Sequence, residues 1–148
     1  MKTIFDPETR AALTGRIGRL EQGCKAQWGK MNVYQMLRHC QKNEELFLGH
    51  KLYKRLLMGR LLGKIALRDI LRDERPMKHN QPTHPEFRIR ENGDNIKGER
   101  ERWIALLKAY DAYPLRELVH PFFGLMTKEQ IGRFVYKHTD HHLRQFGL

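Results

Sequence analysis

Hydrophobic residues recur every three or four positions in four stretches of the chain, a period that predicts α-helices. The predicted helices cover about residues 6–22, 32–48, 102–113 and 127–147. Pro7 suits the first turn of a helix, and Asn32 is a good cap for the second helix. Thr127 and Gln130 form a capping box, so the last helix has the strongest start signal.

The chain between the second and third of these helices has a different pattern. From Leu56 to Leu71, apolar residues fall on one side and a basic stripe on the other, which makes the segment amphipathic. The basic stripe consists of Arg60, Lys64, Arg68 and Arg72. Prolines break the pattern over residues 73–98, which predicts an irregular excursion. The expected fold is therefore an all-α bundle of four main helices with a long irregular insertion between helices two and three.

The composition fits one ordinary globular domain over residues 1–148. Hydrophobic residues make up 40% of the chain and charged residues 30%, which excludes disordered and fibrous classes. Charged residues interrupt the longest apolar stretch, so we expect no bilayer-spanning helix. The start of the sequence lacks a signal-peptide pattern, which points to the cytoplasm. The only two cysteines, Cys24 and Cys40, match no redox or zinc spacing, which favours reduced thiols over a disulfide framework.

The net charge of +11 attracts anions of many kinds, including nucleic acids and lipid surfaces. The basic stripe has three interpretations: a solvated helix face, a surface for membranes or nucleic acids, or the rim of a site that draws in an anionic thiol or carboxylate. The charge alone does not choose among them.

Histidines near the end of the chain carry the clearest chemical signal. His138 and His142 stand four residues apart, so their imidazoles share one helix face about 6 Å apart and can converge on one cation. His141 is rotated away from this pair, and Asp140 is expected at the surface. The alternative is two packed or solvated histidines that happen to fall four apart.

A pair of histidines needs a third ligand from a neighbouring helix, and His39 in the second predicted helix is the candidate. The alternative for His39 is a core histidine satisfied by a hydrogen bond. Gln145 follows His142 by three residues and can orient a ligand imidazole. Gln35 and Asn43 lie four residues on either side of His39 and can do the same. For Gln145, a solvent-facing position is an equally good interpretation.

Two segments of the chain carry a family resemblance. Residues 28–40, WGKMNVYQMLRHC, and residues 138–147, HTDHHLRQFG, resemble the DinB/YfiT-like superfamily of four-helix metalloproteins, in particular a branch of unknown function. Residues 56–76 and 120–127 also look like segments of that branch, so the resemblance extends over most of the chain.

The resemblance implies a three-histidine site for a divalent ion, zinc or nickel, at His39, His138 and His142, with Gln145 as part of the motif. It also implies coordination positions open to water or substrate. Characterised members include transferases and isomerases that use low-molecular-weight thiols such as bacillithiol and mycothiol. The resemblance therefore leads us to expect a metal-dependent S-transferase whose co-substrate is a small thiol.

The sequence also allows other functions. A non-enzymatic protein that binds metal or an anion, including nucleic acid during stress, is the alternative function, and a structural metal is a third. Relatives often pair through helix faces, so a homodimer is consistent with the sequence. We expect Cys40 and Trp28 to be packing residues and His120 to be a solvated loop histidine.

Overall fold

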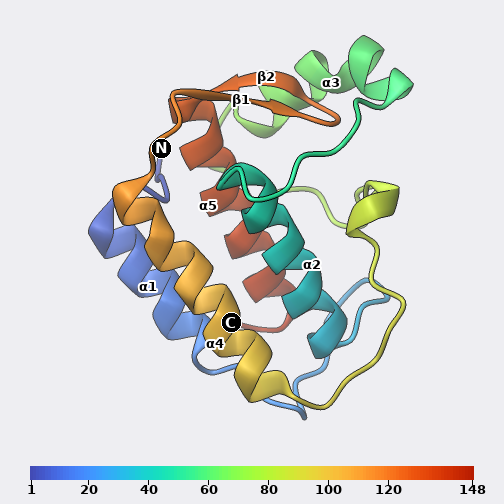
Figure 1. The fold of residues 1–148 in the computed structure, drawn as a ribbon. Coiled ribbons are helices and arrows are strands. Elements are labelled where there is room, and N and C mark those ends of the chain that lie inside the picture. The colour runs from blue at the N-terminus through green and yellow to red at the C-terminus, as the bar shows by residue number, and fades with distance from the viewer.

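The computed structural model describes residues 1–148 and contains five α-helices, two short 3-10 helices and one β-hairpin (Figure 1). In chain order these are α1 (Pro7–Ile17), α2 (Val33–Phe47), α3 (Leu57–Ile70), η1 (Pro85–Phe87), α4 (Ile96–Lys108), η2 (Ala109–Ala112), β1 (Glu117–His120), β2 (Gly124–Thr127) and α5 (Lys128–Gln145).

Helices α1, α2, α4 and α5 pack side by side and bury the apolar core between them (Figure 1). The 25 buried hydrophobic side chains form one contiguous cluster, to which α4 contributes Trp103 and Leu107. Capping boxes at Asn32 and Thr127 satisfy the first backbone N–H groups of α2 and α5, which confirms the predicted starts of both helices.

The prediction of an all-α four-helix bundle is wrong in two respects. Residues 117–127 form an antiparallel hairpin in which Glu117 pairs with Thr127 and His120 pairs with Gly124. Each strand has only four residues, so the alternation of buried and exposed positions is too short to stand out in the sequence. Gly124 closes the turn with φ +79°, a conformation that favours glycine.

The second difference is α3, because the amphipathic basic segment is a fifth helix rather than part of an irregular insertion. Its glycines allow this helix to lie directly on the hairpin: a Cβ atom at Gly59 or Gly63 would collide with the Phe122 backbone. As a result α3 sits at the edge of the molecule beside β1 and β2 instead of inside the bundle (Figure 1).

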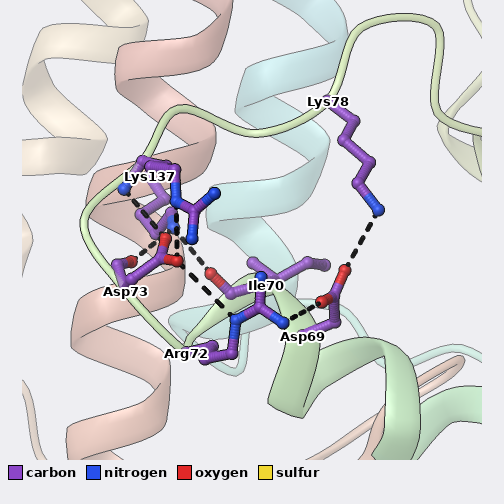
Figure 2. Close-up of polar contacts among 7 residues, drawn as sticks. Asp69, Ile70, Arg72, Asp73, Lys78 and Lys137 are labelled. Atoms are coloured by element: carbon purple, nitrogen blue, oxygen red, sulfur yellow. Dashed lines mark hydrogen bonds and ion pairs between the residues drawn. The ribbon is translucent and has the colours of Figure 1, made fainter.

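Residues 73–98 follow an irregular path apart from η1 and the start of α4, as predicted. A lysine of α5 holds the start of this irregular segment through hydrogen bonds to its backbone. Lys137 donates from Nζ to the carbonyl oxygens of Ile70 at 2.6 Å and Asp73 at 2.8 Å, and so satisfies the exposed end of α3 (Figure 2). Asp69 nearby pairs with Arg72 and Lys78.

The expected boundaries of two helices need correction. α1 ends at Ile17 rather than near residue 22, and Gly18 follows it in a turn that still buries Leu20. α4 begins at Ile96 rather than Arg102, because Asn95 caps it and the polar residues of its first turns face outward. No helix has the length and apolar character required to cross a membrane.

Candidate metal centre

Three imidazole rings from two helices meet inside the bundle. His39 lies on α2, and His138 and His142 lie one turn apart on α5, which packs against α2. Their ligand nitrogens lie within 4.8 Å of one another, and all three side chains are buried. We call these residues the histidine triad. The structure thus brings together the three residues that the sequence analysis singled out.

The three rings face one another closely. The Nε2 atoms of His39 and His138 are 3.2 Å apart. The ring centroid of His142 lies 4.8 Å from that of His39 and 4.6 Å from that of His138. Phe134, one turn earlier on α5, stacks against His138 with an interplanar angle of 16° and closes one side of the cluster.

Hydrogen bonds at Nδ1 determine which nitrogen of each ring holds a proton. His39 Nδ1 lies 3.1 Å from the carbonyl oxygen of Phe87, which can only accept, so Nδ1 carries the proton and Nε2 keeps its lone pair. Gln145 donates from Nε2 to the Trp28 carbonyl at 2.8 Å, which turns its Oε1 toward His142. That oxygen accepts from His142 Nδ1 at 2.9 Å, so His142 also keeps a lone pair at Nε2.

His138 completes a chain of hydrogen bonds. The Asn43 amide nitrogen lies 3.3 Å from His138 Nδ1 and donates to it, so Nε2 of His138 holds the ring proton and donates to Nε2 of His39. Rotation of the Asn43 amide by half a turn places its oxygen at this position. The oxygen then accepts from Nδ1–H and leaves all three Nε2 atoms as lone-pair donors.

Burial keeps the three rings neutral near pH 7. Desolvation is the main cause that lowers the pKa of His39, and it lowers the pKa of His138 and His142 well below the ordinary value. The neighbouring histidines act in the same direction. A neutral imidazole is the form that coordinates a metal, so no proton has to leave the protein before an ion binds.

These properties fit a divalent transition-metal ion. Three neutral imidazole nitrogens on rigid helices suit zinc, nickel or copper, and three protein ligands are typical of catalytic rather than closed structural zinc sites. No cysteine, carboxylate or further histidine belongs to the cluster, so the protein supplies three donors. A tetrahedral ion held by these three donors would have one further position for a small molecule.

A comparison with known protein families assigns the chain to one of them. A family described as "Protein of unknown function (DUF1569)" matches residues 7–147. The chain belongs to this family. Searches of curated proteins and of solved structures returned no match. The DUF1569 match covers all three members of the histidine triad.

Two of the three polar residues expected around the ligands contact the triad in this DUF1569 chain. Asn43 faces His138 and Gln145 faces His142. Gln35 instead lies in the first turn of α2, where its side chain accepts from the backbone N–H of Asn32 as part of the capping box. None of the hydrogen bonds of Gln35 reaches the histidine triad.

Other side chains near the triad differ from the sequence-based interpretation. Asp140 is buried rather than at the surface, and it pairs with Arg16 at 2.7 Å and Arg144 at 2.6 Å. His120, expected in water, is 4% exposed at the end of β1. Cys40 is buried on the apolar side of α2, as expected.

His141 points away from the triad toward a separate aromatic pair. Trp28 stacks on His79 at a centroid distance of 3.8 Å, and His141 meets the edge of this pair. Sequence reasoning missed this stacking because His79 lies in the irregular segment. It also missed Phe87, whose contribution to the site is a backbone carbonyl and therefore leaves no trace in the residue type.

Proposed function

We propose that this DUF1569 protein is a divalent-metal-dependent enzyme in which the histidine triad holds the ion. The observation that carries the proposal is the convergence of three buried imidazoles on one point. A divalent ion there lowers the pKa of a thiol or water that binds beside it, and so supplies a nucleophile near neutral pH. Zinc and nickel are the ions that we favour.

The residues around the triad have roles that suit such a site. The Phe87 carbonyl and the Gln145 side chain hold the rings of His39 and His142 through Nδ1, which would leave Nε2 of each ring to bind the ion. Asn43 can present either its nitrogen or its oxygen to His138, which lets the site change between the metal-free and the loaded arrangement. These contacts orient the three rings through Nδ1 and would leave their Nε2 atoms available to an ion.

For the reaction class we propose S-transfer with a low-molecular-weight thiol as co-substrate. The support is the resemblance of residues 28–40 and 138–147 to DinB/YfiT-like metalloproteins, among which such thiol-dependent transferases occur. Assays with a series of small thiols and electrophiles identify the pair that reacts.

Elemental analysis of purified protein tests the metal site. We expect about one equivalent of zinc or nickel per chain in the wild type. The His142→Ala variant should lose the metal, whereas His50→Ala, which alters an exposed histidine outside the cluster, should retain it. Absence of metal from the wild type after reconstitution with either ion contradicts the proposal.

Thermal unfolding before and after chelation separates an enzyme from a structural metal protein. The 25 buried hydrophobic residues of the core include none of the three histidines. Because this core does not depend on the ion, we expect the protein to stay folded after chelation. A metal-free protein that unfolds at once favours a structural ion instead. With the fold intact, thiol-transferase activity that appears with metal and disappears in His142→Ala supports the proposed reaction class.

A further inference from the structure

Hydrogen-bond donors without partners gather next to the histidine triad. Tyr53 Oη, Arg55 Nε and His84 Nε2 are buried and have no hydrogen-bond partner in the protein. The buried His120 ring makes both of its hydrogen bonds through Nδ1, so its Nε2 is free as well. Buried polar groups in folded proteins are nearly always paired, and three such donors in one region, with the free Nε2 of His120 beside them, therefore need an explanation.

The Phe87 ring is the common neighbour that places these groups together. Its centroid lies 5.1 Å from the ring of Tyr53, 5.2 Å from that of His84 and 6.4 Å from that of His120. Arg55 also lies near His120, because a Cβ atom on Gly124, the strand partner of His120, would lie 2.8 Å from Arg55 Nη1. Burial is the largest cause that lowers the pKa of His120 to about 3, and His84 and Arg55 act in the same direction. The four donors thus come from the segment before α3, the residue before η1 and the end of β1.

Backbone contacts fix both histidines as donors. His120 Nδ1 accepts from the backbone N–H groups of Phe122 and Phe123, each at 3.1 Å. His84 Nδ1 accepts from the N–H of Glu86 at 3.1 Å. A nitrogen that accepts carries no proton, so the proton of each neutral ring is on Nε2. Both rings therefore present an N–H group with no partner.

The charges of the cluster suit one negative charge. Burial lowers the pKa of His84 as well as that of His120, so both rings stay neutral. Burial, with Glu45 and Glu86 nearby, raises the pKa of Tyr53, so its hydroxyl keeps its proton. Arg55 is then the single charged member, and a monoanion with several acceptor oxygens matches the set.

We propose that Tyr53, Arg55, His84 and His120 form a binding site for a small oxyanion, a carboxylate or a phosphate group. The Phe87 carbonyl that orients His39 belongs to the residue at the centre of this site. The oxyanion site therefore adjoins the histidine triad. Its use to hold the anionic group of a substrate beside the ion rests on the proposed function, whereas the binding itself does not.

Anion titrations of metal-free protein test this proposal. Sodium acetate and sodium phosphate are added at constant ionic strength, and the histidine ring signals are followed by ¹H–¹⁵N correlation spectra. We expect saturable shifts of His84 and His120 with at least one of the two anions. Saturation by acetate alone assigns a carboxylate, and saturation by phosphate alone assigns a phosphate. If neither anion saturates, the donors are satisfied by water and the proposal is wrong.

Matched variants separate a specific site from general attraction to a basic protein. Arg55→Gln should weaken binding about tenfold or more, and Tyr53→Phe about threefold or more. Arg60→Gln removes the same charge from an exposed position on α3 and should leave affinity within about twofold. Equal loss in Arg55→Gln and Arg60→Gln refutes the site. His142→Ala should bind the anion normally, so failure of the metal proposal remains distinguishable.

The outer face of α3 supports a second inference from a different observation. Leu57, Leu61 and Ile65 follow one another at intervals of four residues and are 76%, 71% and 65% exposed. Met58 and Leu62 widen this apolar patch. It faces solvent because the glycines of α3 occupy the side that touches the hairpin. An apolar patch of this kind marks an interaction surface.

The charges around the apolar patch indicate what covers it. Residues 50–68 contain no acidic residue, and five lysines and arginines in this range lie outside the oxyanion site: Lys51, Lys54, Arg60, Lys64 and Arg68. A second copy of the chain would bring the same positive charge to the interface. An anionic lipid surface instead complements both the apolar stripe and the cations, as for helices that lie in the membrane interface. We infer that α3 rests its apolar patch on an anionic lipid surface.

Vesicle co-sedimentation tests this second inference. We expect binding to vesicles of equimolar phosphatidylglycerol and phosphatidylcholine, and little binding to pure phosphatidylcholine. Leu61→Gln should reduce the binding about tenfold, whereas Leu52→Gln, at a leucine 72% exposed outside α3, should change it little. Absence of binding to the anionic vesicles, or a dimer in solution that Leu61→Gln dissociates, overturns the inference.

Discussion

Glu44 is an acid sealed inside the helical core, and its replacement gives a quantitative test of the structure. The side chain is fully buried on α2 and accepts a hydrogen bond from the Tyr110 hydroxyl at 2.6 Å. Burial raises the pKa of Glu44 from 4.5 to about 8, although Tyr110 and Trp103 act in the opposite direction. The folded protein therefore holds a proton on Glu44 at pH values where the unfolded chain has released it.

The sign and size of the effect follow from linkage. Because the folded pKa is the higher one, the contribution of Glu44 to stability is complete below about pH 4.5 and is lost as pH rises toward 8. Each pKa unit corresponds to about 1.4 kcal/mol, so at neutral pH the loss is about 3 kcal/mol. Glu44→Gln retains the shape of the protonated acid and has no charge to bury, so this variant should gain about that amount relative to the wild type.

Urea unfolding of the wild type and Glu44→Gln between about pH 5 and about pH 9 measures the difference. The two free energies of unfolding should nearly agree at the acidic end and diverge progressively up to about pH 8. The comparison cancels the contributions of the buried histidines, which both proteins share. Glu101→Gln, at an exposed glutamate of α4, is the matched control and should track the wild type. Parallel curves for wild type and Glu44→Gln would refute the buried-acid argument.

Three further substitutions probe the contacts that shape the molecule and the triad. Gly63→Ala should cost about 1–3 kcal/mol in urea unfolding, because the added methyl group collides with the hairpin, whereas Gly15→Ala, with open space around it, should be neutral or stabilising. Lys137→Met should cost about 1–2 kcal/mol and speed hydrogen exchange at the end of α3, since both backbone contacts of its ammonium are lost. Asn43→Leu should weaken metal binding about tenfold or more in chelator competition, because His138 loses the partner of its Nδ1; unchanged affinity would contradict the role given to that amide.

The sequence predicts the parts of this fold whose signals are local. Helices α2 and α5 carry capping boxes and apolar periodicity, so their positions agree with expectation to within one or two residues. The hairpin could not be predicted in the same way. Its strands pair through the backbone, and a four-residue strand such as β1 shows too little alternation to distinguish it from a loop.

The histidine triad was likewise predictable only where its signal is local. Spacing on one helix places His138 beside His142, and that is a local property. The approach of His39 depends on how α2 packs against α5, which the periodicity of either helix alone does not determine. Phe87 reaches the site through the irregular segment, so neither its carbonyl nor the cluster of donors around its ring has a periodic signal.

Phe87 also connects the two proposed binding sites, and this leads to one more prediction. Its carbonyl holds the His39 ring, while its side chain contacts Tyr53 and His84 of the oxyanion site. A cation in the triad attracts an anion bound beside Phe87, and ordering of this residue by one ligand lowers the cost of binding the other. We therefore expect zinc to increase the affinity for the saturating anion about fivefold or more, and the anion to increase zinc affinity by the same factor. Calorimetric titration of each ligand in the presence of the other measures both factors. If neither ligand changes the affinity for the other, the two sites are not coupled through Phe87, even though each site binds its own ligand.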